Sequence, residues 1–79
     1  MHFVYILKSA KTGRHYIGST EDLARRLEKH NSGATPSTRG GRPWEIVHFE
    51  ELPTKIAALE RERFLKSGKG REIRKRNNW

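Results

Sequence analysis

The sequence contains no cysteine, so neither a disulfide framework nor a zinc site built on thiolates can hold this fold together. It also has no apolar run long enough to span a bilayer, and its first residues lack the basic-then-apolar pattern of a signal peptide. No internal repeat and no second domain is visible. We therefore expect a single domain over residues 1–79, located in the cytoplasm, with a basic C-terminal tail from about residue 69.

Apolar and acidic residues are both scarce. Only 33% of the residues are hydrophobic and the mean hydropathy is −0.93, so nearly every apolar side chain is needed for one modest core. Seventeen Lys and Arg residues outnumber nine Asp and Glu residues, which gives a net charge of +8 and a pI near 10.5. Such a balance favours a polyanionic partner, with nucleic acid as the first candidate, although a charge that merely keeps the protein soluble is the alternative.

Three segments have the composition of β-strands. Residues 2–8 are nearly continuously apolar and rich in β-branched and aromatic side chains, which predicts a central strand buried on both faces. Turn residues at 9–13 separate this segment from a second short strand at 14–18, so the two should form a hairpin. Residues 44–50 alternate in polarity and predict a third strand, which starts just after a proline.

A first helix is predicted after the second strand. Ser19 or Thr20 can cap its N-terminus, and Ser19 with Asp22 has the spacing of a capping box. The segment 31–33, Asn-Ser-Gly, is typical of a helix end.

The predicted first helix has an apolar stripe with two polar side chains beside it. Leu23 and Leu27 lie one turn apart and form the stripe, while Arg26 and His30 fall together on one side of it. Two polar groups in this position can line a cleft, or they can simply face solvent.

A second helix is predicted from Thr54, its cap, to about Lys66. Its apolar side chains cluster on one side, and one carboxylate, Glu62, falls among them. The clustered residues are Ala58, Leu59 and Leu65. Because a lone carboxylate in an apolar stripe is costly to bury, Glu62 should bind something positive, either a functional cation or a structural partner such as Arg26.

Two further segments carry much of the positive charge. Residues 32–43 form a glycine-rich polar stretch without periodicity, and the tail from residue 69 is strongly basic, with Ile73 able to dock it as a short helix. Either segment could contact a phosphate backbone, or be a plain linker and a solvated end. The candidate nucleic-acid contacts are Arg39, Arg42, Lys69, Arg71 and Arg74.

The unusual polar residues fit together chemically as a site for phosphodiester hydrolysis. A carboxylate such as Glu62 can hold one divalent cation, and an arginine such as Arg26 can offset charge that builds on phosphate oxygens. A tyrosine or histidine, from Tyr5, Tyr16 and His30, can position the attacking water or take its proton.

In this order and spacing, the residues resemble the GIY-YIG nuclease superfamily, and most closely its small stand-alone members. Phe3-Val4-Tyr5 falls where the family has its first motif, and Tyr16-Ile17-Gly18 reproduces the second. The family's helix arginine, frequent histidine and metal-binding glutamate match Arg26, His30 and Glu62, so the resemblance covers nearly the whole chain. One residue departs from the pattern: Phe3 replaces the glycine of the first motif, and we expect the strand rather than the chemistry to absorb this change.

The resemblance implies an α/β (α+β) fold with a small three-stranded antiparallel sheet flanked by helices. It also implies a DNA endonuclease that uses one Mg²⁺ or Mn²⁺ ion held by Glu62, with Arg26 stabilising the phosphate. By the same analogy Tyr5 and Tyr16 would position or activate water, with His30 as the competing base. Since a chain of this length has no room for a separate DNA-recognition domain, we expect selection by substrate shape, such as single-stranded or branched DNA, rather than by sequence.

Two other readings compete with a DNA nuclease. The first is a non-catalytic nucleic-acid-binding module on the same fold, and the second is a nuclease or ribosome-associated protein directed to RNA. Retention of all five candidate site residues disfavours pure binding, because binding alone gives no reason for a carboxylate near phosphate. The sequence leaves the oligomeric state and the identity of the general base open.

Overall fold

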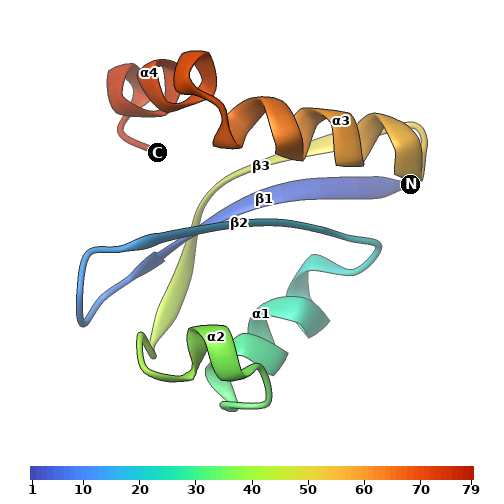
Figure 1. The fold of residues 1–79 in the computed structure, drawn as a ribbon. Coiled ribbons are helices and arrows are strands. Elements are labelled where there is room, and N and C mark those ends of the chain that lie inside the picture. Colours follow the sequence, from blue (N-terminus) through green and yellow to red (C-terminus); the bar gives the residue numbers. More distant parts are fainter.

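The structure is a computed structural model that describes residues 1–79, and it consists of one three-stranded antiparallel sheet with helices on both faces (Figure 1). The strand order is β2-β1-β3, as the predicted fold class requires. The elements in chain order are β1 (His2–Ser9), β2 (His15–Thr20), α1 (Leu23–Asn31), α2 (Pro36–Arg39), β3 (Trp44–Leu52), α3 (Lys55–Lys66) and α4 (Gly68–Asn77).

Strand β1 is the central strand, as its continuous apolar character predicts. It pairs antiparallel with β2 on one side and with β3 on the other, with an irregularity opposite β3 between Ile6 and Leu7. Because successive side chains of a strand point to opposite faces, β1 contributes to both layers of the core. Val4 and Ile6 face the layer that contains α3, whereas Tyr5 and Leu7 face the layer that contains α1.

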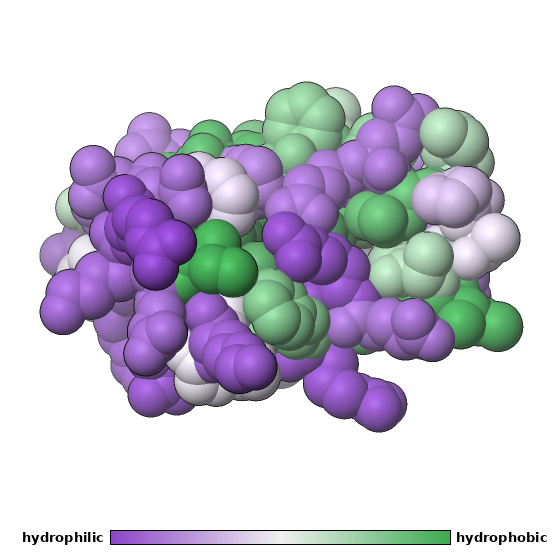
Figure 2. All heavy atoms as spheres, turned by 90° about the horizontal axis from the view of Figure 1, so that it is seen from above, coloured by the Kyte–Doolittle hydropathy of each residue, from purple (hydrophilic) through white to green (hydrophobic).

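The layer under α3 is a small apolar core. Leu65 packs with Val4, Ile6 and Ile17, and all four side chains are buried. Thr54 caps α3 by accepting from the backbone N–H of Ala57, as predicted. The apolar stripe predicted for this helix is only partly right, since Ala58 and Leu65 are buried but Leu59 is 46% exposed. Seen from this side, the surface is mostly hydrophilic with separate apolar patches (Figure 2).

Helix α1 begins later than the sequence predicts. Strand β2 continues through Ser19 and Thr20, both of which pair with β1, so neither residue caps the helix. The cap is Asp22, whose carboxylate accepts from the backbone N–H of Arg25 at 3.1 Å. Pairing with β1 satisfies the backbone of two more residues than a turn would, and Asp22 is an equally good capping residue. The predicted end at Asn31 is confirmed.

Two segments whose structure the sequence left open contain helices. The polar stretch 32–43 contains the short helix α2, and the basic tail forms the helix α4, which contacts α3. Helix α4 starts at a second capping side chain, Ser67, and its end folds back so that the ring of Trp79 stacks on His48 of β3, with 3.4 Å between ring centroids. Glycine at position 70 lets α4 approach α3, because a Cβ there would collide with the backbone of Phe64 and Leu65.

No helix of the structure combines the length and the apolar character that crossing a membrane requires.

Candidate functional site

A hydrogen-bonded chain of three side chains lies under α1, on the face of β1 away from α3. The hydroxyl of Tyr5 lies 3.1 Å from Nε2 of His30, and Nδ1 of His30 lies 2.8 Å from the hydroxyl of Thr38. All three side chains are at most 2% exposed. The chain therefore joins the central strand to α1 and α2 through the interior of the protein.

The chain has one direction, because the hydroxyl of Thr38 donates to the backbone carbonyl of Thr35. Thr38 must then accept from His30, so Nδ1 of His30 carries the proton. In the neutral imidazole Nε2 is then an acceptor, and the hydroxyl of Tyr5 donates to it. Both nitrogens of His30 are thus occupied.

The charges around His30 agree with this neutral form. Burial lowers the pKa of His30, and the positive charges of Arg26 and Lys29 on the same helix lower it further. Burial also raises the pKa of the Tyr5 hydroxyl, and the neighbouring Tyr16 and Glu62 raise it further, while Arg26 opposes them. Both members of the buried pair therefore stay uncharged near neutral pH.

Tyr16 brings a second phenol to the same place. It lies on β2 opposite Leu7, two residue pairs from the Tyr5–Gly18 pair, and its ring centroid is 4.9 Å from that of His30 and 6.4 Å from that of Tyr5. Unlike Tyr5, Tyr16 is only partly buried, and none of the structure's side-chain hydrogen bonds engages its hydroxyl. It is the phenol of the pair that solvent can reach.

Gly18 makes this arrangement possible. Gly18 lies opposite Tyr5 in the β1–β2 ladder, and a Cβ at this position would come within 2.6 Å of the Tyr5 hydroxyl oxygen and 3.2 Å of the Tyr16 ring. Any side chain at position 18 would displace at least one phenol. The glycine of the second motif is therefore needed for close approach rather than for an unusual backbone conformation.

Arg26 lies close enough to Tyr5 and His30 for its charge to act on both. It is half-buried on α1, and it lines a shallow cavity of about 220 Å³ with other mainly cationic or polar side chains. The remaining lining residues are Thr20, Asp22, Arg25 and Lys29. No carboxylate forms an ion pair with Arg26, so its guanidinium is free for an anion.

Glu62 approaches from α3, close enough for its charge to act on Tyr5. Its carboxylate is 20% exposed and pairs with Lys66 one turn further along α3, at 2.8 Å. The structural partner predicted for Glu62, Arg26, is therefore wrong. An i,i+4 partner on the same helix reaches the carboxylate without bridging two layers.

The donor set limits how a divalent metal could bind. No group of three or more histidine, cysteine or carboxylate side chains gathers anywhere in the structure. A Mg²⁺ ion nevertheless commonly keeps several waters and takes only one or two protein carboxylates together with substrate phosphate oxygens. The single carboxylate of Glu62, whose side chain is 20% exposed, fits that mode of binding, with substrate phosphate oxygens and water as the other ligands.

The five predicted nucleic-acid contacts fall into two separate groups. Arg39 and Arg42 belong to the α2 segment, on the α1 side of the sheet, whereas the other three belong to α4, which lies beyond the opposite face (Figure 1). Lys69 and Arg71 are exposed. Arg74 is partly buried and donates from Nε to the carbonyl of Leu65, so one of its roles is to hold α4 on α3.

Sequence reasoning missed the residues that support the site. Thr38 fixes His30, and its carbonyl accepts the indole N–H of Trp44 at 2.7 Å. The side-chain amide of Asn31 bonds both backbone groups of Trp44, at 2.6 and 3.0 Å. In the sequence, only the position of Asn31 directly after His30 pointed to these supporting residues. The contacts join residues that lie 6 to 13 positions apart, so local patterns do not reveal them.

The fold and the site together define a nuclease-type domain, and comparison with known proteins gives the family. The profile of the GIY-YIG catalytic domain matches residues 1–77, so the chain belongs to the GIY-YIG family. It is 43% identical over 67 residues to a UPF0213 protein of Haloquadratum walsbyi, a match that covers 84% of this chain and 74% of that protein.

Two further relatives extend the comparison. The solution NMR structure of a UPF0213 protein from Bacillus halodurans superimposes with a TM-score of 0.53 at 39% identity, covering 91% of this chain and 79% of that one. The structure-specific endonuclease subunit slx1 of Schizosaccharomyces japonicus is 47% identical over 62 residues. That match covers 71% of this chain but only 23% of the slx1 protein, so this chain corresponds to a small part of a much longer protein. These matches confirm the predicted family and fold.

Proposed function

We propose that this protein is a divalent-metal-dependent DNA endonuclease that selects branched or single-stranded DNA by its shape. The observation that carries the proposal is the convergence of two phenols on a buried histidine, with an unpaired arginine, Arg26, and a carboxylate, Glu62, close enough for their charges to act on Tyr5. A protein that only binds nucleic acid has no use for a carboxylate next to phosphate, because the two repel each other.

In this proposal Tyr16 orients the attacking water. Tyr5 and His30 are buried and bonded to each other, so neither offers a free acceptor to a water molecule at the surface. Tyr16 is the accessible phenol and packs against both rings, which hold it in place. Tyr5 and His30 are then positioning residues, and the base left open by the sequence is Tyr16.

In this proposal both Arg26 and Glu62 act on the phosphate. The free guanidinium of Arg26 binds the non-bridging oxygens and offsets the charge that grows on them. Glu62 would hold one Mg²⁺ or Mn²⁺ ion, and the bound ion would supply Lewis-acid stabilisation of the leaving oxygen. Lys66 neutralises the same carboxylate in the absence of the ion.

The substrate class is supported by two observations. The slx1 relative is a structure-specific endonuclease subunit, and this chain is 47% identical to part of it. The exposed cationic side chains, Arg39 and Arg42 beside α2 and Lys69 and Arg71 on α4, suit contact with a phosphate backbone. Binding should therefore rest on phosphate contacts and strand shape.

The test is cleavage of labelled single-stranded, duplex, flap and RNA substrates with Mg²⁺ or Mn²⁺, by the wild type and by Glu62→Gln. We expect cleavage that EDTA abolishes, with a preference for flaps or single strands, and a loss of about 10²-fold or more in rate for Glu62→Gln. Glu60→Gln, on the exposed side of the same helix, is the matched control and should cut normally.

Binding measured in parallel separates the proposal from its competitor. Glu62→Gln should bind DNA at least as tightly as the wild type, because a negative charge near phosphate has been removed. If the wild type binds with strong salt dependence but cuts none of the substrates, the protein is a binding module and the proposal is wrong. Cleavage confined to RNA would contradict the DNA assignment.

A further inference from the structure

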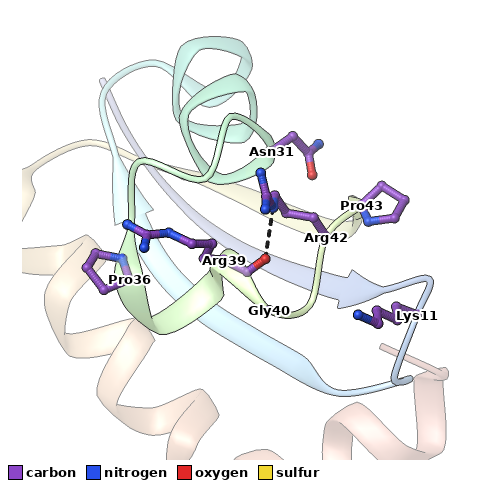
Figure 3. Close-up of a pocket in the computed structure, with 7 residues that line it drawn as sticks. All are labelled: Lys11, Asn31, Pro36, Arg39, Gly40, Arg42 and Pro43. Carbon is purple, nitrogen blue, oxygen red and sulfur yellow. Dashed lines mark hydrogen bonds between the residues drawn. The ribbon is translucent and has the colours of Figure 1, made fainter.

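Two adjoining cavities lie at the hairpin end of the sheet, next to Tyr16. The first has a volume of about 620 Å³ and contains three cationic side chains, Lys11, Arg39 and Arg42, but no carboxylate (Figure 3). The second, of about 380 Å³, is lined by Tyr16 and Trp44 together with Arg14, His15 and small polar residues. Gly40 lines both cavities, so they meet at this residue.

The arginines of the first cavity are held in place by bonds that leave their ends free. Nε of Arg42 donates to the carbonyl of Arg39 at 2.8 Å, and Nε of Arg39 donates to the carbonyl of Gly33 at 2.9 Å. Both bonds use the nitrogen that lies inside each guanidinium fork, and neither arginine pairs with a carboxylate. The terminal nitrogens, which are the ones that grip a phosphate, have no partner in the protein.

The walls of the two cavities are fixed to each other. Ser9 donates from its hydroxyl to the carbonyl of Gly41 and accepts from the backbone N–H of Thr12, so one side chain ties the hairpin loop to the α2–β3 connection. The backbone N–H of Ala10 donates to the carbonyl of Pro43 at 2.9 Å. The loop that carries Lys11 and the loop that carries Arg42 are therefore fixed to each other without a ligand.

The second cavity suits an unpaired base rather than a duplex. Its volume lies in the range of about 300–1,000 Å³ typical of small-ligand pockets, and it offers two aromatic side chains, the usual partners of splayed-out bases. The field there is positive: burial, together with the charges of Arg74 and Lys8, lowers the pKa of His15 on its wall. An anionic nucleotide would be drawn into this field.

We propose that the two cavities, together the hairpin-end subsite, bind one unpaired nucleotide of the substrate strand and an adjacent phosphate. The base enters the cavity beside Tyr16 and Trp44, and the phosphate sits between Arg39, Arg42 and Lys11. This inference rests on the proposed function for its substrate, and it explains why the strand next to the cut must be single. A base inside a duplex is stacked and cannot enter the cavity without being flipped out.

The direct probe is NMR titration with deoxyadenosine monophosphate, deoxyribose 5-phosphate and inorganic phosphate, without divalent metal. The chain has two tryptophans, and only Trp44 lines the subsite, so the Trp79 indole N–H, stacked on His48, is an internal control. We expect the nucleotide to shift the Trp44 indole signal more than either base-free phosphate does, and to leave Trp79 unchanged. Equal shifts of both indoles, or none at millimolar nucleotide, would overturn the subsite.

The second measurement uses Arg39→Gln/Arg42→Gln, with Lys55→Gln/Arg63→Gln on α3 as the control of equal charge. Each phosphate contact contributes about 0.7 to the slope of log K against log salt concentration for single-stranded DNA. Losing two contacts should therefore make that slope less steep by roughly 1.4. The control should change the slope by much less, and binding to blunt duplex should be affected less than binding to single strand. Equal slopes for the two double variants would overturn the proposal.

These outcomes are separable from failure of the proposed function. Both measurements are made without metal and need no cleavage, so they report the subsite alone. A protein that cuts flaps but shows no nucleotide response at Trp44 keeps its nuclease function and loses the subsite.

Discussion

The two faces of strand β1 carry different kinds of buried side chains, apolar on one face and hydrogen-bonded polar on the other. On the α3 face Val4 and Ile6 pack with Leu65 in an apolar cluster, while on the α1 face Tyr5 bonds to His30, which bonds to Thr38. Both sets of side chains are equally buried, at 2% exposure or less. Burial alone therefore does not distinguish a stabilising contact from a functional one in this protein.

The difference lies in what each face requires of its partners. Apolar side chains gain roughly 1.5–3 kcal/mol each from burial whatever their exact neighbours are. Buried polar groups gain nothing unless each finds its partner, and in this structure no buried side-chain nitrogen or oxygen lacks one. The α3 face should therefore tolerate hydrophobic exchange, whereas the α1 face should tolerate almost none.

Leu65→Ala should produce the largest change in stability. It removes a fully buried side chain from the apolar cluster and should lower the free energy of unfolding by about 2–5 kcal/mol, measured by urea denaturation. Leu59→Ala, on the same helix but exposed, should change it by less than about 0.5 kcal/mol. Equal effects for the two variants would mean that the cluster does not carry the stability assigned to it.

Gly18→Ala should affect the function more than the fold. The added methyl group must displace the Tyr5 hydroxyl or the Tyr16 ring, which costs about 1–3 kcal/mol and should lower cleavage about 10²-fold in the folded protein. Gly68→Ala, where a Cβ meets no atom within 4 Å, is the matched control for both measurements. Normal cleavage by a folded Gly18→Ala variant would show that the spacing of the phenols is unimportant.

The smallest effect concerns pH. Because the folded pKa of His30 lies below its ordinary value, the unfolded chain binds the proton first as pH falls. The stability that His30 contributes is therefore complete above about pH 6.5 and is lost as pH decreases toward the folded pKa. The carboxyl of Glu50, whose pKa is lowered chiefly by its bond with Arg61, acts in the same direction only at more acidic pH.

Urea denaturation at pH 7 and pH 5 tests this for the wild type and His30→Gln. The wild type should be less stable at pH 5, and the variant should show a smaller difference between the two. If His30→Gln does not fold, NMR titration of the wild-type imidazole gives the same answer. A His30 pKa at or above the ordinary value would contradict the neutral, two-bond imidazole.

Periodicity predicted most of the framework of this fold. The central place of β1, the hairpin, β3 and α3 with its Thr54 cap all follow from local composition and helix signals. The errors arise where contacts with other elements outweigh the local sequence signals. Pairing with β1 extended β2 through Ser19 and Thr20, and the stretch 32–43, which shows no periodicity, contains the helix α2.

The candidate site was predictable in its residues but not in its connections. Tyr5, Tyr16, Arg26, His30 and Glu62 stand out by type and spacing, and the structure places the two tyrosines beside His30. The structure adds which groups are already paired: Glu62 forms an ion pair with Lys66, and His30 is hydrogen-bonded to Tyr5 and Thr38. Such pairings depend on how α1 and α2 pack, and no periodic pattern in one segment encodes a partner in another.

The side-chain amide of Asn31 has a consequence for self-association. It bonds the N–H and the carbonyl of Trp44, the two backbone groups that a neighbouring strand would otherwise pair with. Asn31 thus closes the first rung of the β3 edge, and the acidic side chains of Glu45, Glu50 and Glu51 lie along the strand beyond it. An Asn31→Ala variant should open that rung to pairing between copies and make the protein more prone to aggregate at high concentration.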